Sequence, residues 1–282
     1  MKGKRVAVIT DSSACLPADL VRELGIVVVP VRVVAGSHVY SDGVDLKPSE
    51  FYERLRQGER FTTASPNIGE YLAAYEAVRG EAEGALCICV PSSFASMYGS
   101  AQAAAAMCEG FPVRVVDCTT AAGGQGLVAL AAARLAARGA ALAEVEQAAR
   151  EAMARVRLVA TLDTLEYLHR SGRAPWIAEW STSLLQIKPL LTVQNGEAKL
   201  LRLARTRRGA IEEMVKIVAG WAQGAETLQI IVQHAGVLDE ADALAQKLQE
   251  SLRPSEIYVT EFTPVMGSHT GPGVLLVALL GA

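Results

Sequence analysis

The sequence has few aromatic residues, no excess of basic charge and no long apolar run. Aromatic side chains make up only 5% of the 282 residues and hydrophobic residues 51%, so we expect an interior of alanine, valine and leucine. The formal net charge of -3 argues against nucleic acid as a partner. No apolar run approaches the roughly 20 residues of a membrane span, and the basic start leads into a strand, not a signal peptide. We therefore expect a cytoplasmic protein without stable membrane insertion.

The sequence also lacks the common nucleotide-binding and nucleophile motifs. It has no G-x-S-x-G elbow, no G-x-x-x-x-G-K-[ST] loop and no G-x-G-x-x-G after its first strand. Acidic residues do not cluster as they do in metal or two-carboxylate sites. Cys87 and Cys89, two of the five cysteines, alternate with isoleucine on a predicted buried strand and lack a companion histidine. We interpret them as small buried hydrophobes and expect neither a metal nor a cofactor.

Polar turns follow several predicted strands at their carboxyl ends. The strand Val6–Ile9 is followed by Thr-Asp-Ser-Ser, and in open α/β sheets ligands bind at this edge. The alternative is that Ser12 or Ser13 caps the helix predicted over Leu16–Leu24. Turns of the same kind precede predicted helices elsewhere, and such helix starts form anion sites. These turns cover Thr62–Asn67, Pro91–Tyr98 and Asp117–Gly126.

A further polar turn lies near the end of the chain, over Gly267–Gly273. It carries a serine, a histidine and a threonine among three glycines and a proline, and it leads into the apolar run Val274–Leu280. Glycine adopts dihedral angles that other residues avoid, so we expect an irregular backbone here. The alternative is an ordinary tight turn with a surface histidine.

The pattern of elements predicts an α/β N-terminal domain, residues 1–155, and an α+β C-terminal domain, residues 156–282. In the first part, strands alternate with helices, which implies a mostly parallel sheet with flanking helices. In the second, Asn195-Gly196 between two apolar runs predicts a β-hairpin. The predicted strands of the first part are Val6–Ile9, Ile26–Val34, Ala85–Val90 and Val113–Val116.

Seven motifs follow one another along the chain. They are Val-Ile-Thr-Asp-Ser-Ser, Thr-Thr-Ala-Ser-Pro-Asn, Tyr-Gly-Ser-Ala, Gly-Gln-Gly, the segment Leu162–Arg173, Ile-Lys-Pro-Leu-Leu and His-Thr-Gly-Pro-Gly. In this order they resemble the motifs of the DegV family. The resemblance implies a fatty-acid-binding protein that is not itself an enzyme and that presents a long-chain fatty acid to a separate kinase subunit. It also implies an acyl chain in a buried apolar tunnel with its carboxylate between the two domains.

The resemblance assigns ligand-binding roles to residues of the first loop and of the last turn. Thr63 matches the family threonine that hydrogen-bonds the carboxylate, while Ser65 and Asn67 occupy the positions of a glutamine and a serine. His269 matches the histidine near the head group, and Thr270 follows it in the same motif.

The loop before Tyr98 departs from the family pattern. Aligned on this tyrosine, the family's Ser-Gly-Thr-Tyr becomes Ala-Ser-Met-Tyr, so Ala95 replaces the carboxylate-binding serine. Ser93 or Ser96 would substitute for it if the loop shifts. Arg173 matches the arginine of a Gly-Gly-Arg segment, although closing a helix end is an equally good local interpretation.

The resemblance also points to a kinase-docking stretch at Arg205, Arg207 and Arg208. A solvated surface is the usual interpretation of such a basic run, and only the resemblance favours docking. Trp176 and Trp180 lie four residues apart, and we interpret them as core or interface residues.

Two other functions remain open from the residues alone. One is an enzyme, either a small-molecule phosphotransferase or a serine hydrolase using Ser96 and His269 with Asp11 or Asp117. The other is a binder of a different anionic amphiphile.

Overall fold

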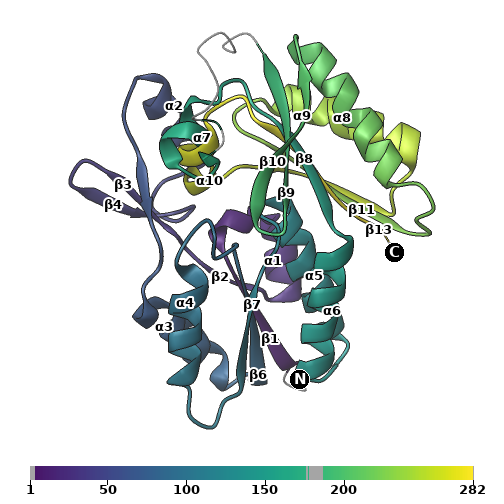
Figure 1. Cartoon of the computed structure of the whole chain (residues 1–282). Helices are drawn as coiled ribbons and strands as arrows, with labels where there is room; N and C mark the ends of the chain where they lie inside the picture. The colour runs from purple at the N-terminus through teal and green to yellow at the C-terminus, as the bar shows by residue number, and fades with distance from the viewer. Residues whose placement is uncertain (1–3, 176, 178–186, 282) are drawn as a thin grey trace.

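The computed structural model describes residues 4–175, 177 and 187–281, which form three β-sheets surrounded by helices (Figure 1). Trp176 and Trp180 lie outside this range. None of the helices within it is long and apolar enough to cross a membrane. The elements up to residue 155 are β1 (Lys4–Asp11), α1 (Ala18–Leu24), β2 (Val27–Val29), β3 (Arg32–Ala35), β4 (His38–Ser41), α2 (Pro48–Arg56), β5 (Thr62–Ala64), α3 (Ile68–Arg79), β6 (Ala82–Cys89), α4 (Met97–Ala106), β7 (Val113–Asp117), α5 (Gly123–Ala137) and α6 (Leu142–Arg155).

The first sheet contains four parallel strands in the order β2-β1-β6-β7. Its central strand β6 is fully buried over Ala85–Cys89, because helices cover both faces of the sheet. The Cys87 and Cys89 sulfurs lie 3.7 Å apart within this core. The prediction of a mostly parallel N-terminal sheet is confirmed.

A second, small sheet was not predicted. It contains three antiparallel strands in the order β4-β3-β5, and its β3–β4 hairpin projects to the left in Figure 1. The single strand predicted over Ile26–Val34 is therefore wrong, since β2 ends before Pro30 and β3 belongs to this other sheet. Proline has no N–H to donate to the ladder. The chain is held at the break by Val31, whose N–H donates to Ser12 Oγ at 3.0 Å.

The third sheet contains six strands in the order β10-β9-β8-β13-β11-β12, which all follow residue 155. Only the β11–β12 pair is parallel. The predicted hairpin is confirmed, since β9 and β10 pair antiparallel around Asn195 and Gly196, whose φ angles are 54° and 76°. The remaining elements are β8 (Arg157–Thr161), α7 (Glu166–Ser171), β9 (Lys188–Gln194), β10 (Glu197–Ala204), α8 (Arg207–Trp221), β11 (Leu228–His234), α9 (Leu238–Leu252), β12 (Glu256–Glu261), α10 (Pro264–Thr270) and β13 (Leu275–Gly281).

The polar turn expected over Gly267–Gly273 is only partly irregular. Its first half is the last turn of helix α10, and only Gly271 and Gly273 adopt positive φ angles, of 77° and 83°. Pro264 opens this helix, at a position where its missing N–H costs nothing.

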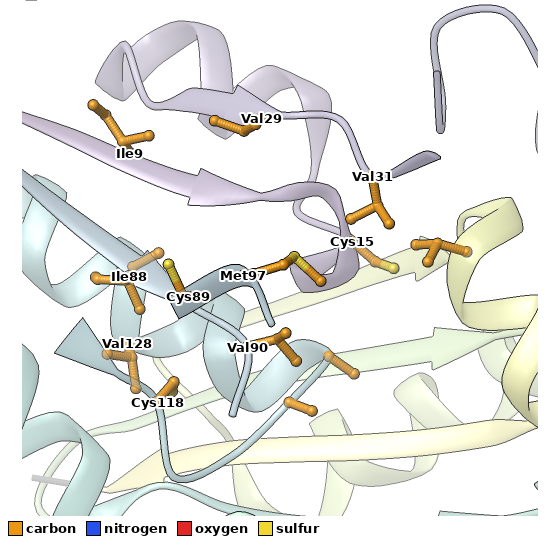
Figure 2. Packing of buried hydrophobic residues seen from close by; sticks show 14 of the residues in the cluster. Ile9, Cys15, Val29, Val31, Ile88, Cys89, Val90, Met97, Cys118 and Val128 are labelled. Carbon is orange, nitrogen blue, oxygen red and sulfur yellow. The ribbon is translucent and has the colours of Figure 1, made fainter. Parts of the chain in front are cut away.

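Helix α5 lies between the parallel sheet and the six-stranded sheet and joins their cores. Most of its residues are buried, and it contacts β1 on one side and β13 and β11 on the other. Gly123 and Gly126 permit this close approach, because a Cβ on Gly126 would lie 3.2 Å from the Ala14 carbonyl oxygen. In the shared core, Figure 2 shows residues from segments far apart in sequence packed together, among them Cys15, Val31 and Val90.

Candidate functional site

An apolar cavity of about 160 Å³ lies at the carboxyl edge of the parallel sheet, where the six-stranded sheet faces it. Residues of the loops and turns after β1, β6 and β7 line one side, namely Ser13, Val90 and Ala121. Strands of the six-stranded sheet line the other side, with Leu158 and Leu191 among them. The cavity thus occupies the edge at which open α/β sheets bind ligands.

The polar end of the cavity is formed by Thr63, Ser65, Arg173, His269 and Thr270. Thr63 Oγ1 and His269 Nε2 are within 3.0 Å and form a hydrogen bond between β5 and α10, two elements far apart in sequence. All five residues were predicted as ligand-binding residues from the sequence, and the fold brings them to one cavity. What remains of the lining is almost entirely apolar.

The His269 imidazole is neutral at neutral pH. Burial, reinforced by the positive charge of Arg173, lowers its pKa from 6.5 to about 4. A neutral imidazole has one N–H donor and one acceptor nitrogen. His269 therefore presents hydrogen-bonding capacity in the cavity without contributing a charge of its own.

Arg173 supplies the positive charge at this end. Its Nε donates to the Phe94 carbonyl oxygen at 3.2 Å and its Nη1 to the Ser171 carbonyl oxygen at 2.6 Å. Burial lowers its pKa, but an arginine remains protonated in proteins. No carboxylate among residues 4–175, 177 and 187–281 forms an ion pair with it. A guanidinium held by neutral carbonyls beside an apolar cavity is suited to an anionic group.

Asp42 fixes the helix that carries His269, and it was not among the residues predicted from the sequence. Its Oδ1 accepts from Val265 N at 2.9 Å and so caps α10 from another segment of the chain. Burial raises the Asp42 pKa to about 6. No local signal identifies this role, because an Asp-Gly pair in sequence indicates only a turn.

Two glycines at the end of α10 permit close contacts that a side chain would prevent. A Cβ on Gly271 would lie 2.3 Å from the ring of Tyr167 in α7. A Cβ on Gly273 would lie 2.0 Å from Asp163 Oδ2. The Leu162–Arg173 segment therefore packs directly on the turn that follows His269, although its role could not be read from the sequence.

The side chains of Thr270 and Asn67 form hydrogen bonds with backbone atoms close to them in sequence. Thr270 Oγ1 donates to the Met266 carbonyl oxygen at 2.8 Å within α10. Asn67 lies outside the cavity and caps α3, where its Oδ1 accepts from Glu70 N at 3.1 Å. The local interpretation of the Asn67 turn as a helix cap is therefore the one that the geometry supports.

Neither Ser93 nor Ser96 lines the cavity. Ser93 Oγ donates to the Gly196 carbonyl oxygen at the tip of the β9–β10 hairpin, whose Gly196 N–H donates to the Thr119 carbonyl oxygen at 2.9 Å. Ser96 is exposed and precedes α4. Ala95 does line the cavity, so no hydroxyl replaces the missing serine at that position.

The three arginines of the predicted docking stretch have different surroundings. Arg205 is exposed, and the Arg208 side chain is 90% exposed and pairs with Glu212 at 2.9 Å. Arg207 is only 21% exposed because it pairs with Glu240 at 2.9 Å and Asp163 at 3.6 Å. Of these three arginines, Arg205 and Arg208 are exposed and Arg207 is largely buried by its ion pairs.

The groups proposed for a hydrolase do not assemble. His269 bonds Thr63, whereas Ser96 is exposed outside the cavity. Asp11 is buried, and its carboxylate accepts from Val90 N and Gln125 Nε2, both at 2.9 Å, so it joins the ends of β1 and β6 to α5.

Asp117, the other acid considered for a hydrolase, also forms hydrogen bonds away from His269. Asp117 accepts from Ser92, from the backbone N–H at 2.8 Å and from Oγ at 2.5 Å. These two bonds anchor the loop after β6 to the end of β7. Both acids therefore hold the carboxyl edge of the parallel sheet together.

Comparison with known proteins finds similarity over the whole chain. The sequence model of the DegV family matches residues 5–281. A DegV domain-containing protein of Streptomyces coelicolor is 33% identical over 274 residues, covering 96% of this chain and 97% of the relative. Protein DegV of Bacillus subtilis is 30% identical over 272 residues, covering 96% and 97% of the two chains.

Solved structures agree in fold over nearly every residue. A fatty-acid-binding DegV family protein from Thermus thermophilus is 31% identical, with a TM-score of 0.92 and coverage of 99% of this chain and 100% of the other. Bacillus subtilis DegV, described as a fatty acid binding protein, is 28% identical, with a TM-score of 0.91 and the same coverage.

Proposed function

Because the chain belongs to the DegV family, we propose that it binds a long-chain fatty acid and acts as a carrier, not as an enzyme. The acyl chain occupies the apolar cavity, and the carboxylate lies at its polar end against Thr63, His269 and Arg173. The observation that carries this proposal is the hydrogen-bonded Thr63–His269 pair beside a guanidinium that lacks an acidic partner among the described residues.

The chemistry of the polar end favours a carboxylate. The Arg173 guanidinium provides a positive charge, and Thr63 and neutral His269 provide hydrogen bonds that do not add charge. Hydrogen bonds to an ionised acceptor are stronger than those between neutral groups. The fatty-acid-binding relatives from Thermus thermophilus and Bacillus subtilis support the same ligand class.

Affinity and orientation come from different parts of the ligand. Burying one methylene contributes about 0.8 kcal/mol, so a long chain supplies most of the binding free energy. One hydrogen bond left unmade at the head group costs about 1–3 kcal/mol. The missing hydroxyl at Ala95 therefore weakens the polar end without abolishing binding.

Native mass spectrometry of the purified protein, followed by organic extraction, tests the ligand class. We expect one long-chain fatty acid per chain. If the extract contained a different anionic amphiphile, that compound and not a fatty acid would be the ligand. A chain that carries no ligand and takes up no added fatty acid would refute it.

The carrier role further implies a separate kinase subunit that phosphorylates the bound carboxylate, and an ATP-dependent step of this kind belongs in the cytoplasm. Arg205 and Arg208 are exposed near the start of α8 and are the proposed docking residues. We expect R205E/R208E to lower acyl phosphate formation with the kinase while leaving fatty acid affinity unchanged.

Arg22→Glu is a matched control, since Arg22 is also exposed but lies on α1. The chain without a kinase should form no acyl phosphate from ATP. If the isolated chain formed it, the protein would be an enzyme. If R205E/R208E behaved like R22E, docking would involve another surface.

A further inference from the structure

A second hollow, of about 480 Å³, lies outside the cavity and is half polar. We call it the outer groove. Its walls come from α6, the end of α8 and the β9–β10 hairpin (Figure 1). Two arginines and an asparagine line it together with three large apolar side chains, namely Arg150, Arg157, Asn195, Met153, Leu201 and Trp221. None of the five residues at the polar end of the cavity lines the outer groove, so it is a separate site from that of the head group.

The outer groove carries a net positive charge. Arg157 forms no ion pair with any carboxylate in the part of the chain that the structure describes. Arg150 pairs with Glu146 at 2.7 Å, but Glu146 also pairs with Arg114, so one carboxylate serves two guanidinium groups. None of the described residues that line the groove is acidic. A hollow lined by charge of one sign concentrates ligands of the opposite sign.

The backbone at the end of α6 positions the Arg157 side chain. Its Nη1 donates to the Ala154 carbonyl oxygen at 2.9 Å and to the Val156 carbonyl oxygen at 2.8 Å. Within the described residues, no hydrogen bond uses its Nε or Nη2. A guanidinium has five N–H donors in a planar fork that matches two oxygens of a phosphate. The fold thus holds Arg157 in place and leaves donors for an anion.

The number of arginines separates this site from the polar end of the cavity. The polar end has one guanidinium, Arg173, which matches the single charge of a carboxylate. The outer groove has two guanidinium groups in its lining. A phosphate ester carries a charge of about −1.5 to −2 at pH 7 and has three acceptor oxygens. Two guanidinium groups therefore match a phosphate ester better than a carboxylate.

The apolar side of the outer groove suits a flat ring. Trp221, Met153 and Leu201 are partly buried and all line the groove. An indole ring stacks on other rings, and a thioether sulfur makes favourable contacts with them. Asn195 is exposed at the hairpin tip, and its side-chain amide offers both donors and an acceptor to polar atoms of such a ring.

We propose that the outer groove binds a small phosphate ester that carries a flat ring, as a mononucleotide does. The phosphate lies against Arg150 and Arg157, and the ring lies against Trp221. The volume of about 480 Å³ exceeds the roughly 150 Å³ of an engineered apolar cavity that binds benzene, so the groove has room for both parts. This site goes beyond the proposed fatty acid site and does not depend on it.

Calorimetric titration with AMP, adenosine and inorganic phosphate tests the site. AMP should bind most tightly, because it alone has both the ring and the phosphate. R157Q should weaken AMP binding at least tenfold, since it removes a charged donor to the phosphate. R155Q is the matched control, because Arg155 is an exposed residue of α6 that does not line the groove.

A second pair of variants tests the charge without touching Arg157, whose side chain also bonds the backbone. Ala154 is exposed within the groove, whereas Ala143 is exposed on the same helix outside it. In A154E the new carboxylate repels the phosphate and competes for the arginines, so AMP affinity should fall at least tenfold. A143E should bind AMP as the wild type does. Both variants should bind fatty acid as the wild type does, because neither residue lines the cavity.

Three results would overturn the inference. A wild-type chain that binds no AMP would have no such site. Equal AMP affinity in the wild type, R157Q and A154E would place AMP elsewhere on the molecule. If inorganic phosphate bound as tightly as AMP, the ring contact with Trp221 would be wrong. None of these results bears on the fatty acid proposal, which fails only if the chain takes up no fatty acid.

Discussion

At the polar end of the cavity, hydrogen bonds hold Thr63, His269 and Arg173, whereas apolar side chains line most of the rest of the cavity. Thr63 and His269 bond each other, and Arg173 bonds the Phe94 and Ser171 carbonyls. Leu158 and Leu191 are among the apolar residues, which can contact a ligand without directional bonds. The polar end depends on the positions of a few groups, so the two regions should respond differently to substitution.

The largest effect is expected where a glycine permits the polar end to form. Gly271→Ala introduces a Cβ 2.3 Å from the Tyr167 ring at a φ of 77°. Left-handed strain and overpacking each cost about 1–3 kcal/mol, so we expect the free energy of unfolding to fall by about 3 kcal/mol or more. Denaturant unfolding measures this loss.

Gly139→Ala separates these two causes. Gly139 has a φ of 83°, but its Cβ would meet nothing within 4 Å. This variant should therefore lose only the strain of a positive φ angle, about 1–2 kcal/mol. If both alanine variants lost the same free energy of unfolding, crowding against the Tyr167 ring would not contribute to the loss.

The pH dependence of stability should expose two opposing groups at the two ends of α10, His269 in its last turn and Asp42, which caps its start. The folded-state pKa of His269 is about 4, below its usual 6.5, so the unfolded state binds the extra proton and His269 destabilises the protein as pH falls through this range. The folded-state pKa of Asp42 is about 6, above its usual 3.8, so here the folded state binds the extra proton. The contribution of Asp42 to stability therefore rises as the pH falls through nearly the same range. Each contribution is at most on the order of 3 kcal/mol.

Single variants separate the two groups. Between about pH 6.5 and 4, H269Q should gain stability relative to the wild type as the pH falls. D42N, which keeps an oxygen for Val265 N, should lose stability relative to the wild type between about pH 6 and 4. Unfolding measured across this range would contradict the assignment if the three curves ran parallel.

Removing the Thr63 hydroxyl should affect binding more than folding. Thr63→Val keeps the shape of the side chain and loses the bond to His269, together with the proposed bond to a carboxylate. We expect fatty acid affinity to fall by about 1–3 kcal/mol, measured by calorimetry. Thr62→Val is the matched control, because Thr62 is exposed on the same strand and does not line the cavity. An equal loss in both variants would place the carboxylate elsewhere.

The contrast between local signals and distant contacts also explains which parts of the fold could be predicted from the sequence. The parallel sheet followed from apolar runs alternating with helices, and the hairpin followed from Asn195-Gly196, because these signals are local. Helix α10 was missed, since its stability comes from distant groups: Asp42 caps it, and Gly267 packs on the Phe51 and Tyr52 rings. A seven-residue helix with an internal glycine has little helical propensity of its own.

The residues of the candidate site also differ in whether the sequence could predict them. Family resemblance identified Thr63, His269 and Arg173, because short polar motifs are visible in a sequence. The apolar part of the cavity depends on which residues of the two sheets face each other, and no local motif signals that. Ser96 lies outside the cavity because the chain enters α4 with this side chain facing solvent.

The smallest effect is expected from restoring the absent hydroxyl. Ala95 lines the cavity, so Ala95→Ser places a donor within it, whereas Ser96→Ala removes a hydroxyl that is exposed outside it. A typical hydrogen bond contributes about 0.5–1.5 kcal/mol, so A95S should bind fatty acid about 2- to 12-fold more tightly and S96A should bind as the wild type does. Unchanged affinity in A95S combined with a loss in S96A would mean that the loop rotates on binding and that Ser96 reaches the carboxylate. The polar end would then be completed only when the ligand binds, and its contrast with the apolar lining would become one between a mobile and a fixed wall.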